Sequence, residues 1–184
     1  MEEYSKMRKL HKTIVIPLLV ILLGIAVFGF IDYRSKETVT VIQKTSSSQN
    51  MPVGGTYLEI QEVQSEPIEK ELPKKMKEEQ VQDVIHQMSH QKVRAEKKWG
   101  FIPLTRERVD RLIEIVKANQ YEHENVYLDI LKEWKESNFT YIDRNHNAIW
   151  ILQDGNVGKA TGILTLEEEL KYIEQHYSIK QEND

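Results

Sequence analysis

The stretch EEQVQDVIHQMSHQKVRAEKKW, residues 78–99, marks the point where the folded part of this chain begins. Apolar side chains recur in it at spacings of three, four and seven residues, which is the repeat of an amphipathic helix. They are Val81, Val84, Ile85, Met88, Ala95 and Trp99. Gly100 follows, and Pro103 cannot continue a helix because it has no backbone N–H. The pattern therefore predicts a first helix over 78–99.

Three more helices are predicted downstream by the same repeat. The second has Thr105 as its N-cap, and the third holds the apolar stripe of residues 126–134. The last begins with a capping box, in which the side chains of Thr165 and Glu168 each accept the backbone N–H of the other residue. We therefore expect a mainly α fold, with a small C-terminal domain of four helices over residues 78–184.

The segment between the third and the last of these helices, residues 139–164, has no clear repeat. Its apolar run at 148–152 is too short to be assigned by period, so a buried helical turn and a strand both remain possible. Gly155, Gly158 and Gly162 follow the run and favour a loop or a hairpin. We expect an irregular, glycine-rich segment before the last helix.

Residues 32–77 are rich in serine, proline, glycine and charged side chains, and they hold few large apolar ones. This composition predicts a flexible stalk. Two short alternating stretches, at 39–42 and 57–63, leave open a hairpin across Gly54 and Gly55.

The run TIVIPLLVILLGIAVFGFI, residues 13–31, carries no charge and is long enough to cross the roughly 30 Å core of a bilayer as a helix. It predicts one transmembrane helix in contact with lipid, and a cleaved signal peptide is the alternative. Lysine and arginine are more frequent in residues 1–12 than just after the run. We therefore expect a single-pass protein of the cell membrane, with a cytoplasmic leader at 1–12 and an extracytoplasmic part at 32–184.

The whole chain holds 25 Lys and Arg against 29 Asp and Glu, and its formal net charge is −4. Such an even mixture lacks the basic stripe that phosphate binding requires, so we expect no nucleic-acid partner. A nucleotide is not expected either, because Gly155 and Gly158 are too close together for a phosphate loop and Ala160 replaces its hydroxyl residue. The absence of cysteine excludes disulfides and thiolate metal ligands.

His86 and His90 are four residues apart on the first predicted helix, a spacing that many zinc sites use. The metalloprotease motif needs a glutamate after the first histidine, and Gln87 stands there instead. No third ligand follows at a recognisable spacing, so we predict no metal, no cofactor and no catalytic residue. If a metal does bind, the ligand candidates are His86, His90 and His146.

Loops carry binding groups more often than core helices do, and the glycine-rich segment concentrates polar side chains around Trp150. These form the predicted interaction surface: Asn145, His146, Asn147, Asp154 and Lys159. Trp99, Trp134 and Trp150 are themselves expected in the core, and not as a platform for sugar rings, because each follows or lies within an apolar stretch.

The sequence HQMSHQKVRAEKKWG at 86–100 resembles a module of small uncharacterised proteins of Bacillus-type Gram-positive bacteria. HNAIW at 146–150, the glycines at 155–158 and the acidic triplet at 167–169 resemble the C-terminal half of the same module. The resemblance covers about residues 82–177. It implies a domain of unknown function behind an N-terminal anchor, and it supplies no catalytic residues.

Two functional hypotheses follow from these observations. The first is a membrane-anchored envelope protein whose helical domain is a non-enzymatic interaction module for another envelope protein or the cell wall. The alternative is a metal-dependent envelope enzyme that uses the histidines of the domain. They differ in whether the fold brings His86, His90 and His146 to one point.

Overall fold

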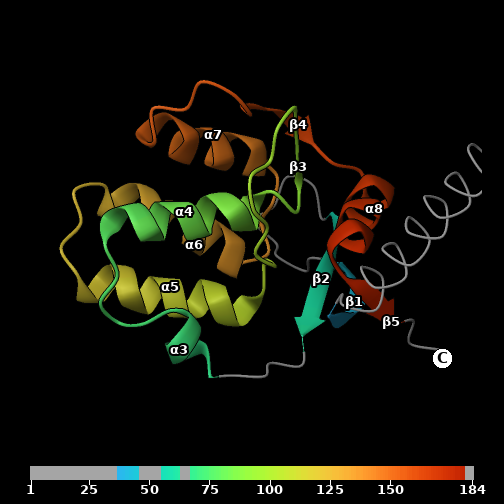
Figure 1. Ribbon diagram of the computed structural model, residues 1–184, viewed down its shortest axis with the longest axis horizontal. Helices are drawn as coiled ribbons and strands as arrows, with labels where there is room; N and C mark the ends of the chain where they lie inside the picture. The colour runs from blue at the N-terminus through green and yellow to red at the C-terminus, as the bar shows by residue number, and fades with distance from the viewer. Residues whose placement is uncertain (1–36, 46–54, 63–66, 181–184) are drawn as a thin grey trace, which may run out of the picture. The chain divides into compact units, whose positions relative to one another are not determined.

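The computed structural model describes residues 37–45, 55–62 and 67–180 (Figure 1). From Thr38 onward, these residues belong to one compact unit. They form six helices and five strands in two sheets. In chain order these are β1 (Thr38–Thr45), β2 (Thr56–Glu62), α3 (Ile68–Glu71), α4 (Glu78–Ser89), β3 (Val93–Ala95), α5 (Arg106–Ala118), α6 (Glu124–Lys135), α7 (Ile142–Leu152), β4 (Ala160–Ile163), α8 (Leu166–His176) and β5 (Ser178–Lys180).

The prediction of a mainly α, four-helix domain behind a flexible stalk is wrong. Thr38–Thr45 and Thr56–Glu62 of the supposed stalk are strands that pair antiparallel, with Val41 opposite Ile60. β1 also pairs in parallel with β5, so the sheet order is β2-β1-β5. The antiparallel pair is the hairpin that the alternating stretches at 39–42 and 57–63 left open. The added pairing with β5, from the far end of the chain, could not be predicted from these segments.

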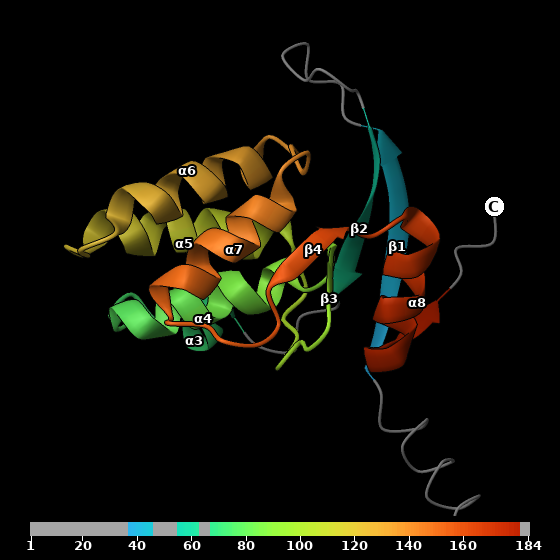
Figure 2. The ribbon, with the colours of Figure 1, turned by 90° about the horizontal axis from the view of Figure 1, so that it is seen from above.

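The helices α4 to α7 lie together on one side of this unit, and the three-stranded sheet lies with α8 on the other (Figures 1 and 2). The core between the helices is built from side chains that are fully or almost fully buried. Among them are Val81, Met88, Leu112, Ile115, Tyr127, Leu131 and Ile149. A second, smaller core joins the sheet to α8 through Val39, Leu58, Ile60 and Ile173.

The first predicted helix begins at Glu78 as expected but ends at Ser89, ten residues early. Beyond it, Val93–Ala95 forms β3 and pairs antiparallel with β4, with Val93 opposite Ile163. The Gln91 side chain accepts the backbone N–H of Leu104. Tertiary pairing therefore overrides the helical repeat here. The supposedly irregular segment is equally regular, because it contains α7 and β4.

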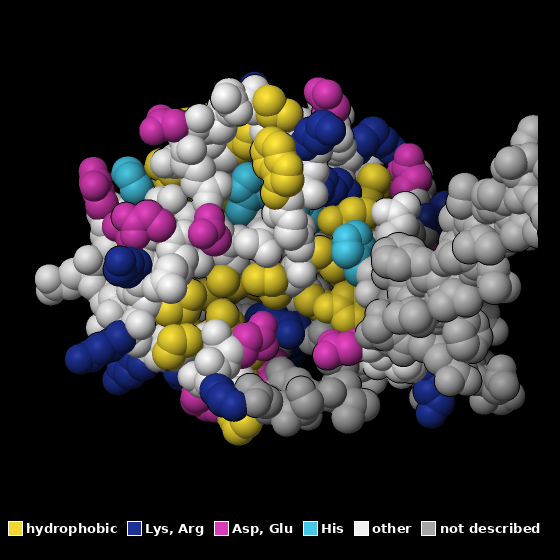
Figure 3. Space-filling view, viewed as in Figure 1, with side chains coloured by type: hydrophobic (Ala, Val, Ile, Leu, Met, Phe, Trp, Pro, Cys, Tyr) yellow, Lys and Arg dark blue, Asp and Glu magenta, His cyan; other side chains and the backbone are white. Residues whose placement is uncertain are grey.

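Large hydrophobic side chains also remain on the surface, and several are visible on the face in Figure 3. Trp134 is in the core, as predicted. Trp99 is not, since 65% of its surface is exposed. Trp150 is only partly buried. Two of the three tryptophans are thus available at a surface.

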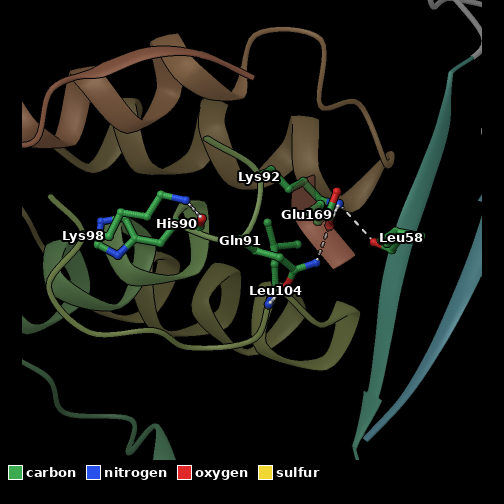
Figure 4. A network of polar contacts seen from close by, with 7 residues as sticks. All are labelled: Leu58, His90, Gln91, Lys92, Lys98, Leu104 and Glu169. Carbon is green, nitrogen blue, oxygen red and sulfur yellow. Dashed lines mark hydrogen bonds and ion pairs between the residues drawn. The ribbon is translucent and has the colours of Figure 1, made fainter. Parts of the chain in front are cut away.

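A buried polar network fastens the two sides of the unit together (Figure 4). The Lys92 ammonium donates to the Glu169 carboxylate of α8 at 2.7 Å and to the Leu58 carbonyl of β2 at 3.0 Å. It also lies 4.5 Å from the centre of the Phe139 ring. Gln91 donates to the same Glu169 oxygen at 2.8 Å. The Lys92 and Glu169 side chains are almost fully buried, and these hydrogen bonds compensate for the water that both charged groups lose.

The predicted capping box is present at the start of α8, where Thr165 Oγ1 accepts the Glu168 N–H and Glu168 accepts the Thr165 N–H. We expect Thr165→Ala to lower the free energy of unfolding by about 1 kcal/mol, because it leaves a helix N–H without its acceptor. Thr165→Ser keeps the hydroxyl and should leave stability unchanged. Chemical denaturation measures the difference, with the exposed Gln175→Ala of the same helix as control. Equal stability of the Thr165→Ala and Thr165→Ser variants would contradict this account.

Among the described residues, no helix is both long and apolar enough to cross a membrane. The longest, α5, has 13 residues, whereas a span needs about 20. The transmembrane helix predicted over 13–31 lies outside the described residues. The predicted single-pass location in the cell membrane is therefore not supported by the described residues.

Candidate metal centre

The packing of α4 against α7 brings three histidines together. His86 and His90 lie one turn apart on α4, and His146 faces them from α7. The centre of the His146 ring is 4.4 Å from that of His86 and 5.4 Å from that of His90. One ring nitrogen of each residue lies within 4.8 Å of one ring nitrogen of the other two. The three candidate ligands therefore meet at one place. The positions of the histidines along the sequence could not predict this meeting, because His146 follows His90 at no recognisable spacing.

The Nδ1 atoms of His86 and His90 are held by oxygen atoms that can only accept a hydrogen bond. His90 Nδ1 lies 2.8 Å from the carbonyl oxygen of Gly100. His86 Nδ1 contacts Gln153 Oε1, and Gln153 in turn donates its amide N–H to the Asp83 carboxylate at 2.8 Å. That second bond fixes the orientation of the Gln153 amide, because a carboxylate accepts only. Both imidazoles must therefore carry their proton on Nδ1.

The Nδ1 of His146 is held in the same way by a hydroxyl. It lies 2.8 Å from Ser89 Oγ. The Ser89 hydroxyl already donates its hydrogen to the carbonyl oxygen of His86 at 2.5 Å. Since a hydroxyl has one hydrogen, Ser89 must accept from His146. The His86 and His90 rings are thus protonated on Nδ1 and unprotonated on Nε2, and Ser89 favours the same tautomer for His146.

The Nε2 of His146 faces a second acceptor, the carbonyl oxygen of Gly158, at 3.2 Å. The Gly158 carbonyl therefore competes with Ser89 Oγ for the single N–H of a neutral His146 ring. Protonation of both nitrogens is disfavoured, since burial lowers the pKa of His146 to about 3 and that of His90 to about 4. Burial also lowers the pKa of His86. Neutral imidazoles with a free nitrogen are the form in which histidine binds metals.

Two glycines supply the carbonyls that contact the histidines, and both need a positive φ. Gly100 has φ 80° and Gly158 has φ 86°, values that side chains rarely adopt. A Cβ on Gly158 would also approach the carbonyl oxygen of Lys97 to 2.6 Å. These two positions therefore require glycine if the backbone is to reach the rings.

The centre opens into a cleft of about 570 Å³. His86 and His90 line the cleft together with Trp99, Trp150, Gln153 and Gly158. Histidine side chains are visible at the surface of the face in Figure 3. An ion held by the three rings would thus be reachable from solvent.

The five residues of the predicted interaction surface do not gather on one exposed face. Asn145 is buried and donates to Glu133, and Asn147 donates to and accepts from the backbone of Ala160. His146 belongs to the histidine cluster. Asp154 lines the cleft, and Lys159 is exposed with its ammonium 6.0 Å from the Trp150 ring. The interaction surface stays a prediction, and these placements do not favour it.

The part of the chain that bears the three histidines matches a family model. Residues 85–174 match DUF6241, a family of unknown function. The match includes all three histidines and the four residues that contact their rings, Ser89, Gly100, Gln153 and Gly158. It confirms the prediction of a domain of unknown function, and it does not address the anchor or the bacterial origin that the resemblance implied. No curated protein and no solved structure matches the chain.

We expect the protein to lose stability as the pH falls below about 6.5, the usual pKa of histidine. The folded pKa values of His90 and His146 are depressed to about 4 and about 3. Between these values and about 6.5 the unfolded chain binds protons that the folded chain does not, so the free energy of unfolding falls with pH. Thermal melts from about pH 7.5 to about pH 4 measure it.

The control for this pH dependence is His90→Gln, which removes one of the two strongly depressed groups. Its melting temperature should fall less steeply over the same interval. An equally steep fall would show that other groups, such as carboxylates, cause the loss of stability.

Proposed function

We propose that this chain is a metal-binding protein, in which His86, His90 and His146 hold a divalent transition-metal ion through Nε2. The observation that carries the proposal is the hydrogen bonding of the three Nδ1 atoms. Histidines that bind metals nearly always donate their other N–H to a carbonyl, a carboxylate or a similar acceptor, which fixes the ring and its tautomer. Here every ring has such an acceptor, and two of these acceptors are themselves held by a further hydrogen bond.

The ligand chemistry favours zinc. Imidazole nitrogens suit Zn²⁺, Cu²⁺, Ni²⁺ and Fe²⁺, whereas Mg²⁺ and Ca²⁺ prefer oxygen ligands. Nitrogens around a tetrahedral Zn²⁺ ion lie roughly 3.3 Å apart, given Zn–N distances of about 2.0–2.1 Å. One ring nitrogen of each histidine lies within 4.8 Å of one ring nitrogen of the other two, so small shifts of the rings toward a common ion complete the site.

Three protein ligands leave a fourth position on the ion for water or a substrate, as in catalytic zinc sites. Bound to zinc, that water ionises near neutral pH and becomes a nucleophile. This supports the metal-dependent alternative of our two hypotheses over the non-enzymatic interaction module, because Asn145 and His146 of the predicted interaction surface are buried.

The test is a metal titration of the full chain after treatment with a chelator. We expect one Zn²⁺ ion per chain by calorimetry, with a Kd below about 1 μM. Co²⁺ should give the intense visible absorption of four-coordinate cobalt, and Mg²⁺ should give no heat. Zinc binding no tighter than about 1 mM, or a weakly absorbing six-coordinate cobalt complex, would overturn the proposal.

A further inference from the structure

We infer that the cleft above the histidine centre binds an uncharged oligosaccharide, with Trp99 as the platform on which a sugar ring stacks. The inference rests on the proposed function, because it names the substrate class of the same cleft. Four features of the lining support it. They are an exposed tryptophan, a second tryptophan in a fixed orientation, two side-chain amides that are free to bind a ligand, and a lining that has no net charge once the metal is bound.

The residues before and after Trp99 are both held by hydrogen bonds to His90, while the Trp99 side chain is exposed to solvent. Gly100, which follows it, accepts the His90 N–H. Lys98, which precedes it, donates its ammonium to the His90 carbonyl at 2.9 Å and lies 3.8 Å from the centre of the Tyr172 ring (Figure 4). The indole nevertheless lines the cleft with 65% of the residue exposed. A large exposed aromatic side chain on a fixed backbone is typical of a ligand-binding surface.

Trp150 forms a second, fixed aromatic wall of the same cleft. Its indole N–H donates to the carbonyl oxygen of Val157 at 2.8 Å. Its ring packs so closely on Gly155 that no Cβ fits there. The ring is therefore held in one orientation, and it lines the cleft together with Trp99.

The polar part of the lining suits hydroxyl groups. Gln87 and Asn156 line the cleft, and their side-chain amides make no hydrogen bond with the described residues. An amide can both donate and accept, as a sugar hydroxyl does. The flat apolar faces of a sugar ring fit an indole, while its hydroxyl edge fits such amides.

The charges of the lining favour a neutral ligand. Three carboxylates, those of Glu79, Asp83 and Asp154, stand against the one ammonium of Lys97. A divalent ion on the three histidines brings the formal charge of the lining to zero. A lining with no net charge offers an anionic sugar no electrostatic attraction, and the volume of about 570 Å³ is ample for a small ligand.

The test is calorimetry of the full chain with two uncharged hexamers, cellohexaose and the hexamer of N-acetylglucosamine, and with anionic hexagalacturonate. We expect at least one neutral hexamer to bind with a Kd below about 1 mM, and the anionic one not to bind. Which neutral hexamer binds distinguishes plain from acetamido sugars. Trp99→Ala should weaken binding about tenfold, and Trp99→Phe should retain most of it. Tyr141→Ala, an exposed aromatic position outside the cleft lining, is the matched control.

Each outcome decides between the two claims. If neither neutral hexamer binds, if hexagalacturonate binds instead, or if Trp99→Ala and Tyr141→Ala bind alike, the sugar site is refuted, while a positive zinc titration keeps the metal centre. If a hexamer binds the chelator-treated chain in a Trp99-dependent manner and zinc does not bind, the metal centre is refuted and the sugar site stands.

Discussion

Replacing His86 by alanine is expected to weaken zinc binding by more than about 100-fold, beyond the 10- to 100-fold range that the loss of an outer partner costs. His86 is the least buried of the three histidines, so its removal disturbs the core least. The loss follows because two nitrogen ligands from different helices hold a divalent ion far less tightly than three. Calorimetric titration of the chelator-treated full chain gives the change in Kd.

Two further variants test the arrangement around His86. Gln153→Ala removes only the acceptor of the His86 N–H and should weaken zinc binding by about 10- to 100-fold. His123→Ala removes an imidazole that lies outside the cluster and should leave the Kd unchanged. If His86→Ala and His123→Ala bind zinc equally well, the ion is not held where we place it.

Replacing Lys92 by methionine is expected to lower the free energy of unfolding by about 3–5 kcal/mol. The side chains of Lys92 and Glu169 are 4% and 5% exposed, and their charged atoms are 2.7 Å apart. Without the ammonium, the buried Glu169 carboxylate keeps the hydrogen bond from Gln91 but loses its ion pair. Urea denaturation of the full chain measures the loss.

The double variant Lys92→Met/Glu169→Gln separates a lost charge pair from lost packing. It removes both charges and keeps an amide oxygen that can accept from Gln91, so most of the stability should return. The solvent-exposed pair of Lys171 and Glu167 serves as control, and Lys171→Met should leave the midpoint unchanged. A double variant as unstable as Lys92→Met would mean that the methionine itself packs badly.

The sequence predicted the fold unevenly, and the reason differs between elements. The starts of α5 and α8 were predicted at Thr105 and Thr165, because a cap depends on residues only three positions away. The end of α4 was missed, because the backbone from Lys92 to Ala95 pairs with β4, some 70 residues further along the chain. Strands of three or four residues are too short to show a period.

The candidate site was predicted in part for the same reason. His86 and His90 were recognisable as a pair, because the helical repeat places residues four apart on one face. Their meeting with His146 was not, because it depends on the packing of α4 against α7. The partners of the three Nδ1 atoms are one glycine carbonyl and two side chains. They form no recognisable motif, so sequence reasoning missed Ser89, Gly100 and Gln153.

By itself, then, the sequence determined the local features of this protein: where helices begin, which faces are apolar, and the lack of thiolate chemistry. These depend on neighbours within one or two turns. Only the tertiary structure decided which strands pair, that Trp99 is exposed, and that three imidazoles meet with hydrogen-bond acceptors at their Nδ1 atoms. Those properties arise from contacts between distant segments, where burial and hydrogen-bond partners are set by the packing of whole helices and sheets.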